Sequence, residues 1–357
     1  MSEQRKQAIR YADQNQEKFL DNLKTLVSIP SVSTNPENIP DMHRAAGLLS
    51  DHLKSLGMQN VQIMPTAGHP VVYAEWMQGC PGCPTMLIYG HYDVQPSEPN
   101  ELWTTSPFEP TIRGENLYGR GASDMKGQVI ATLSAVEAVQ HAGPLPVNLK
   151  FVLEGEEEIG SPSLTSFLET HKDLLACDFA LNPDAGMIGP DTPTIIYALR
   201  GLAYFELRVY GAAHDLHSGM YGGVVHNPAQ VLCDLVAGMH DGQGRITLPG
   251  FYDQVRALPE EERAELARLP MTEAYYRTQT GVSQTWGEAG YSPSERIGAR
   301  PTLEVNGLLA GFTSKGSKTV IPAHAMAKIS MRLVPDQDPN EVHKQLLSYL
   351  EAHAPKT

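Results

Sequence analysis

Residues 84–94, PTMLIYGHYDV, contain the strand pattern from which the fold class can be predicted. The run Met86–Tyr89 is almost continuously apolar, which is typical of a strand buried on both faces of a sheet. Strand-like and helical patterns alternate around it as far as about residue 190. Strands are expected within 61–65, 71–76, 84–94, 147–158 and 177–184, and helices over 3–27, 41–56, 125–141 and 163–175. This alternation predicts an α/β domain whose mostly parallel sheet is flanked by helices.

The pattern changes near residue 200. The expected elements are a half-exposed strand over 202–210, a helix over 227–240, strands near 302–309 and 318–334, and a helix over 339–353. Residues 241–300 are charged and are expected to be irregular. We therefore predict two domains, 1–200 and 201–357, of which the second is an α+β unit with its helices on one side of the sheet.

The composition narrows the classes of partner. The 357 residues include 27 Lys and Arg against 41 Asp and Glu, so the formal net charge is −14. A net acidic chain argues against nucleic acid or an anionic membrane as the main partner. The polar start, MSEQRKQAIRY, has no apolar signal region, and no apolar run approaches the ~18–20 residues of a membrane helix. We therefore expect a cytoplasmic protein with no membrane segment.

The four cysteines indicate neither a disulfide scaffold nor a zinc site. Four are too few for a disulfide scaffold. Cys80 and Cys83 form a C-x-x-C within GCPGCP, but a zinc knuckle would need a second ligand pair. We interpret them as two thiols in a hairpin loop.

Two reactive side chains follow the apolar run Met86–Tyr89. His91 and Asp93 are two residues apart, so on a strand they face the same side. They would then point together into the crevice at the carboxyl end of the sheet, where open α/β sheets bind ligands. A histidine beside a carboxylate suits either a metal ligand with its orienting partner or a His–Asp catalytic pair.

Acidic residues lie at three further strand or helix ends. Asp124, in YGRGASDMKG, directly precedes an expected helix, where it is either a ligand or the helix N-cap. Four glutamates lie within 154–158 after the apolar FVL, and Asp184 follows a strand in LNPDAG. Carboxylates packed at one sheet edge repel one another unless a cation compensates, although charge runs are also common on solvated surfaces. One histidine and several carboxylates together predict a dinuclear site for zinc, manganese or cobalt.

One more histidine stands in a suggestive setting. The motif DLHSGMYGG, residues 215–223, places His217 in a Gly-rich loop. Such a histidine either donates a hydrogen bond to a reacting oxygen or is an ordinary loop residue. The sequence has no Gly-x-Ser-x-Gly elbow, P-loop or GxGxxG fingerprint, which argues against serine hydrolases and nucleotide-binding proteins.

In their order along the chain, these motifs resemble the di-metal aminoacylase/carboxypeptidase/desuccinylase family of metallopeptidases, and within it the carnosinase and cytosolic nonspecific dipeptidase branch. The motifs are GHYDVQP, LYGRGASDMKGQ, EGEEEIGS, LRGLAYFEL, DLHSGMYGG, GSKTVIP and ISMRLVP, between residues 90 and 335. The resemblance implies a zinc-exopeptidase-like catalytic domain with an inserted lid and dimerisation domain. It implies hydrolysis of dipeptides or short peptides by a metal-activated water, and a homodimer formed through the lid.

The resemblance also implies a metal centre of two divalent ions, zinc first and manganese or cobalt as alternatives. The residues that match its ligands are His91, Asp124 and Asp184 for one metal, and Asp124, as a bridge, with Glu158 for the other. Glu157 matches the general base, and Asp93 matches the partner that orients His91. A cis peptide between Asp124 and Met125 is implied as well.

Three residues of the second domain match positions that act on the substrate. His217 resembles the lid histidine that reaches the active site of the other subunit and stabilises the oxyanion. Thr319 and Arg332 match substrate-contacting positions, and Arg332 would clamp the substrate carboxylate.

The family pattern continues with a returning segment that carries a Gly-rich loop and the last histidine ligand of the second metal. Near the end of this sequence only His343 and His353 occur, both on the expected last helix. We therefore expect the lid's last strand and the end of the catalytic domain to be missing. The 357 residues alone would then bind at most one metal well and show little activity.

Two alternatives to a dipeptidase stay open. They are an N-acyl amino-acid deacylase or desuccinylase of the same fold, and a non-catalytic binding or dimerisation module.

Overall fold

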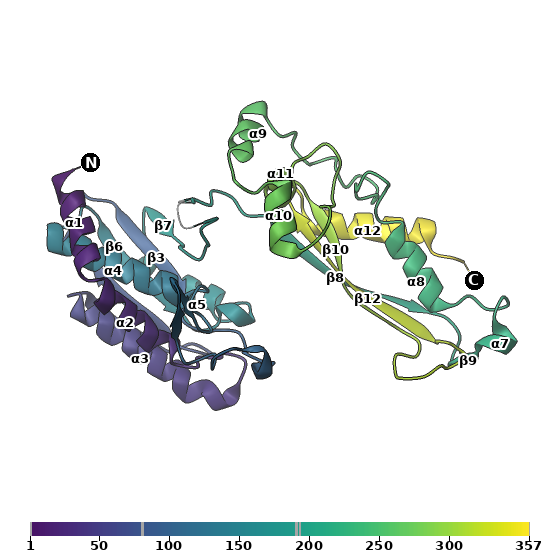
Figure 1. Cartoon of the computed structure of the whole chain (residues 1–357), viewed down its shortest axis with the longest axis horizontal. Coiled ribbons are helices and arrows are strands. Elements are labelled where there is room, and N and C mark those ends of the chain that lie inside the picture. The colour runs from purple at the N-terminus through teal and green to yellow at the C-terminus, as the bar shows by residue number, and fades with distance from the viewer. Residues whose placement is uncertain (1, 80–81, 190–191, 193, 357) are drawn as a thin grey trace. The chain divides into compact units, whose positions relative to one another are not determined.

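The chain forms two compact units, Met1–Met187 and Ile188–Thr357 (Figure 1). The structure is a computed structural model, and it describes residues 2–79, 82–189, 192 and 194–356. Each unit combines a sheet with helices, so the predicted α/β class is confirmed. We refer to them as unit 1 and unit 2.

The sheet of unit 1 brings the ends of three strands to one edge. Its strands, in spatial order, are β1 (Gln59–Met64), β2 (Val71–Trp76), β6 (Asn148–Glu154), β3 (Thr85–His91) and β7 (Phe179–Leu181). Strands β6, β3 and β7 pair in parallel, whereas β2 is antiparallel to both of its neighbours. His91 stands opposite Glu154 in this register, so the segments that follow β3, β6 and β7 meet at the carboxyl edge.

Helices cover both faces of this sheet. On one side lie α1 (Glu3–Gln14), α2 (Gln16–Val27), α3 (Ile39–Ser55) and α4 (Lys126–Ala142), and on the other α5 (Leu164–Thr170) and α6 (Lys172–Leu175). Leu49, Leu133 and Phe151 belong to the main core, and Phe167 and Leu175 to a smaller cluster on the opposite face. Short elements complete the unit: η1 (Pro36–Asn38), η2 (Asn100–Leu102), η3 (Glu157–Ile159), β4 (Thr111–Arg113) and β5 (Asn116–Tyr118).

The expected single helix over 3–27 is wrong, because the chain leaves the helical conformation at Asn15. The side chain of Asn15 donates to the Tyr11 carbonyl oxygen at 2.8 Å, and its backbone N–H bonds to the carbonyls of Tyr11 and Ala12. Asparagine competes in this way with the regular helical bonds, so α1 ends at Gln14 and a separate helix, α2, begins at Gln16. The expected helix over 163–175 is likewise two short helices, α5 and α6.

Unit 2 is a three-stranded antiparallel sheet with helices on one face. The strands lie in the order β10 (Thr302–Ala310), β12 (His324–Leu333) and β8 (Gly201–Tyr210), and the main helices are α8 (Pro228–Ala237) and α12 (Pro339–His353). Leu232, Ile329 and Leu346 pack in its core. A small ribbon of β9 (Leu216–His217) and β11 (Val320–Ile321) leads into α7 (Ser218–Tyr221).

The irregular structure expected for 241–300 is also wrong in part, since this segment contains three short helices. They are α9 (Glu260–Ala267), α10 (Glu273–Thr280) and α11 (Pro293–Gly298). Their apolar periodicity is weak, and side-chain caps help to fix two of them: Thr272 caps α10, and Ser292 and Glu295 form a capping box at α11. A buried ion pair also fixes this segment: Arg300 donates to both oxygens of Glu288, at 2.7 and 2.9 Å.

Removing the Glu288 charge should destabilise unit 2. Glu288→Gln would leave Arg300 buried without a full counter-ion, so we expect the free energy of unfolding to fall by about 3 kcal/mol. The matched control is Glu265→Gln, whose partner Arg268 is exposed and whose loss should cost below about 1 kcal/mol. Urea unfolding followed by fluorescence measures both, and equal losses in the two variants would contradict the prediction.

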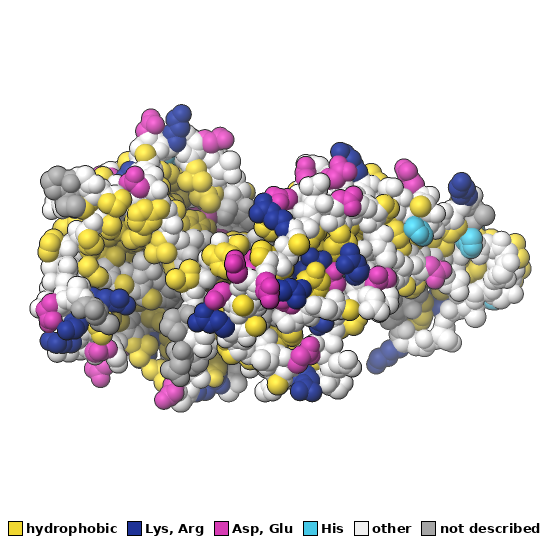
Figure 2. Space-filling model, turned by 90° about the horizontal axis from the view of Figure 1, so that it is seen from above, with side chains coloured by type: hydrophobic (Ala, Val, Ile, Leu, Met, Phe, Trp, Pro, Cys, Tyr) yellow, Lys and Arg dark blue, Asp and Glu magenta, His cyan; other side chains and the backbone are white. Residues whose placement is uncertain are grey.

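Among the residues that the structure describes, no helix has both the length and the hydropathy that a bilayer crossing needs. Figure 2 shows basic and acidic side chains interspersed on the face in view, with apolar side chains exposed over unit 1.

Cys83 is disulfide-bonded, so the interpretation of two thiols is wrong for this residue. Cys80 lies outside the described residues.

Candidate metal centre

Three predicted ligands of one metal come together at the carboxyl edge of the unit 1 sheet. His91, Asp124 and Asp184 each offer a ligand atom, and these atoms lie within 4.8 Å of one another. Nε2 of His91 is 3.1 Å from Oδ1 of Asp124 and 3.7 Å from Oδ2 of Asp184. One imidazole nitrogen with carboxylate oxygens is a donor set that zinc, manganese and cobalt accept, so these residues fit a divalent ion.

His91 is the buried centre of this group. It ends β3 and is 0% exposed, and its Nδ1 faces Asp93, at 3.3 Å from Oδ1 and 3.1 Å from the backbone oxygen. Burial lowers the pKa of His91, but the hydrogen bond to Asp93 and the charges of Asp93, Asp184 and Glu157 outweigh it and raise the pKa to about 9. The surrounding carboxylates therefore stabilise a positive charge at this position, which a proton or a divalent cation can supply.

Asp124 is positioned by the loop before α4. The interpretation of Asp124 as a helix N-cap is wrong, because α4 has Met125 at that position and no side-chain cap. The Asp124–Met125 peptide is cis, as the family resemblance implies. The side chain of Gln128, one turn into α4, donates to the Ser123 carbonyl at 2.6 Å and to the Ala185 carbonyl at 3.4 Å. Gln128 thus joins the loop of Asp124 to the loop of Asp184.

The acidic run after β6 divides into two pairs. Glu154 and Glu156 are buried and structural: Glu154 accepts from the Tyr89 hydroxyl at 2.5 Å, and Glu156 accepts from the His69 backbone N–H at 3.1 Å. Glu157 and Glu158 are half-buried on η3. The run is therefore not a solvated acidic surface.

The two half-buried glutamates share one electrostatic setting but differ in their contacts. Burial is the largest effect on both, and it raises the pKa of Glu157 and of Glu158 above the ordinary glutamate value. Glu157 Oε2 lies 3.9 Å from Nε2 of His91. Glu158 lies outside the three-residue group around His91, and its carboxylate instead accepts from Gln95 at 2.8 Å.

Asp93 links the histidine to both glutamates. It is 0% exposed, its Oδ1 accepts from the backbone N–H of Glu157 at 3.2 Å, and its Oδ2 accepts from that of Glu158 at 3.1 Å. Its predicted neighbour was His91 alone. Sequence reasoning missed these contacts, and also those of Gln95 and Gln128, because a neutral amide side chain carries no signal of its own.

In unit 2 the structure brings His217 and Thr319 together. Nδ1 of His217 accepts from the Gly219 backbone N–H at 3.1 Å, so the proton belongs on Nε2, which lies 3.1 Å from the Thr319 hydroxyl oxygen. The pairing of β9 with β11 sets this contact, because His217 stands opposite Val320.

Arg332 is far from that pair within unit 2. The ribbon joins the sheet at the start of β12, where Ala323 bonds to Gly211 and to Asp215. Arg332 is exposed near the other end of β12, opposite Leu202. The eight residue steps from His324 to Arg332 span about 26 Å of strand, at ~3.3 Å per residue.

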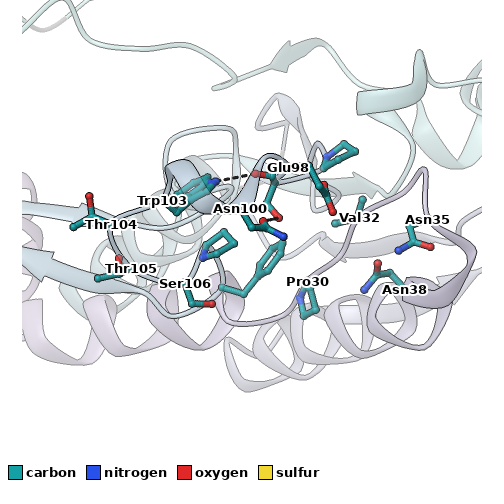
Figure 3. Close-up of a pocket in the computed structure, with 14 residues that line it drawn as sticks. Pro30, Val32, Asn35, Asn38, Glu98, Asn100, Trp103, Thr104, Thr105 and Ser106 are labelled. Carbon is teal, nitrogen blue, oxygen red and sulfur yellow. Dashed lines mark hydrogen bonds between the residues drawn. The ribbon is translucent and has the colours of Figure 1, made fainter.

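A separate pocket of about 770 Å³ lies in unit 1 between residues 30–38 and 96–108 (Figure 3). Its wall is internally bonded: Trp103 donates to the Ser97 carbonyl at 2.8 Å, and the Ser97 hydroxyl donates to Asn100 at 2.8 Å. None of the predicted metal ligands lines it. It is therefore distinct from the metal centre.

Comparison with known proteins identifies the class that this fold and site define. Residues 87–296 match the model of peptidase family M20/M25/M40, and the chain belongs to this family. It is 34% identical to the human Beta-Ala-His dipeptidase, over 96% of this chain and 70% of that protein, and 31% identical to the Cys-Gly metallodipeptidase DUG1 of Candida albicans, over 95% and 73%. The solved structure of human carnosine dipeptidase 1 covers 97% of this chain and 76% of its own, with a TM-score of 0.78 and 34% identity. The predicted family is confirmed.

Proposed function

We propose that this protein hydrolyses the peptide bond of dipeptides or short peptides with the help of divalent metal. The observation that carries the proposal is the group of His91, Asp124 and Asp184 beside Glu157 at the carboxyl edge of the sheet. The names of the relatives, a Beta-Ala-His and a Cys-Gly dipeptidase, support the substrate class. Unit 1 would be the catalytic domain and unit 2 the lid and dimerisation domain of a cytoplasmic enzyme.

In this proposal His91, Asp124 and Asp184 hold one ion, and Asp124 and Glu158 contribute to a second. Zinc is the first expectation, with manganese or cobalt as alternatives. Bound metal would supply Lewis-acid polarisation of the scissile carbonyl and would lower the pKa of water. Asp93 contacts Nδ1 of His91 and so fixes the ring, which would leave Nε2 available as the metal ligand.

Glu157 is the general base of the proposed reaction. Its carboxylate is half-buried and close to His91, and burial raises its pKa above the ordinary glutamate value, in the direction that favours a general base. Glu157 would accept the proton of the attacking water at a carboxylate oxygen and pass it to the leaving amine.

Substrate contacts would come from unit 2. The Arg332 guanidinium suits a bidentate clamp on the substrate carboxylate, and Nε2–H of His217, beside Thr319, suits a donor to the oxyanion. A dipeptide spans only about 7 Å, whereas roughly 26 Å of strand lies between the ribbon end of β12 and Arg332. One chain's His217 and Arg332 therefore do not fit one dipeptide. This supports a homodimer in which His217 serves the other subunit.

Removing the metal should abolish hydrolysis. After treatment with a chelator, we expect the full-length protein to lose turnover of β-alanyl-histidine and cysteinyl-glycine, and to regain it when zinc, manganese or cobalt is added back. Elemental analysis before and after gives the metal content independently of activity. N-acetyl and N-succinyl amino acids are the matched substrates: turnover of these alone would contradict the dipeptidase assignment and favour a deacylase.

A further inference from the structure

The segment after β3 contacts Glu158 through two alternate residues. Asp93 accepts from the backbone N–H of Glu158, as described above, and the side-chain amide of Gln95 donates to the carbonyl oxygen of Glu158 at 3.0 Å and to its Oε2 at 2.8 Å. The backbone N–H, the backbone carbonyl and the carboxylate of Glu158 are thus all held from the same segment.

The backbone around Gln95 is fixed on both sides. Val94 is buried and donates its N–H to the Ser31 carbonyl at 2.9 Å, and Arg120 donates to the Pro96 carbonyl at 2.9 Å. Although the Gln95 side chain is exposed, it extends from an anchored position. Because its backbone is anchored, the hydrogen bonds of Gln95 can hold the Glu158 side chain in one orientation.

Glu157 and Glu158 differ in the hydrogen bonds that their carboxylates accept, and the difference suits their proposed roles. Among the described residues, no side chain or backbone N–H donates a hydrogen bond to the Glu157 carboxylate, whereas Glu158 is held by Gln95. A base must take up and release a proton, but a metal ligand gains from a fixed orientation. An amide is a suitable holder, because it donates to one carboxylate oxygen without neutralising the charge that attracts the metal.

We propose that Gln95 is a positioning residue that directs the carboxylate of Glu158 at the second metal. This inference rests on the proposed function, because it needs a metal bound by Glu158. Gln95 would touch neither the reacting atoms nor the group of His91, Asp124 and Asp184. It acts only through Glu158.

The test is metal binding by the full-length protein, measured by titrating the metal-free form with Co²⁺ and following the visible absorption. Gln95→Met keeps the length of the side chain and removes the donor. We expect the weaker Co²⁺ affinity to fall by about 10- to 100-fold, the tighter one to stay unchanged, and excess metal to restore turnover. Gln140→Met is the matched control, because Gln140 donates to a backbone carbonyl, that of Leu56, far along α4.

A double-mutant cycle separates positioning from a merely structural role. If Gln95 acts through the Glu158 carboxylate, Gln95→Met should have no further effect on Co²⁺ affinity in a Glu158→Gln background. Equal losses in both backgrounds, or wild-type affinity in Gln95→Met, would overturn the inference while leaving the proposed function intact. A wild-type protein that binds no Co²⁺, Zn²⁺ or Mn²⁺ would instead remove the proposed function, and this inference with it.

Discussion

Glu157→Gln should abolish almost all peptide hydrolysis while the protein keeps its metal. The amide has nearly the shape of the carboxylate but cannot accept the proton of the attacking water, so we expect kcat to fall by about 10²- to 10⁴-fold. The backbone N–H of Glu157 would still bond to Asp93, so η3 should stay in place. Turnover of β-alanyl-histidine and elemental analysis of the same sample measure the two quantities.

The neighbouring substitution is the natural control. Glu158→Gln changes the same chemical group one residue along, but here we expect loss of metal, with activity recovered in part when metal is in excess. The two variants should therefore fail in different ways. If Glu157→Gln kept ordinary turnover, or lost its metal as Glu158→Gln does, Glu157 would not be the base.

The position of the site was predictable because it follows from strand geometry. The apolar run 86–89 places a buried strand, and the residues directly after parallel strands meet at one edge of a sheet. His91 and Asp184 needed only this rule to be placed near each other. Asp124 was harder, since a residue before a helix is commonly a cap, and the sequence does not show that Met125 takes that position.

What could not be predicted depends on contacts between segments that are distant in the sequence. The run 154–158 consists of similar residues, and only the hydrogen bonds of Glu154 and Glu156 to other loops decide which carboxylates are structural. The break at Asn15 and the starts of α10 and α11 depend on single side-chain bonds rather than on apolar periodicity. The separation of Arg332 from His217 depends on strand pairing, which local patterns do not reveal.

His217→Ala should lower kcat by about 10²-fold, the usual effect of losing one oxyanion donor, with KM for the dipeptide changed much less. His214→Ala is the matched control, because His214 is an exposed histidine three residues before His217, on the loop that leads into β9. Its turnover should equal that of the wild type. Thr319→Ala should give a smaller loss than His217→Ala, since Thr319 would act by holding the histidine ring.

The same variant tests whether the histidine acts across a dimer. Chains carrying His217→Ala have an intact base, and chains carrying Glu157→Gln have an intact histidine, so each mixed dimer would contain one complete site. With free exchange, half of the dimers are mixed and half of their sites are complete, so we expect roughly a quarter of wild-type turnover to return. Sedimentation must first establish the dimer. Mixed dimers that stay as inactive as their parents would show that His217 acts within its own chain, and that unit 2 must bring His217 and Arg332 to the substrate in some other way.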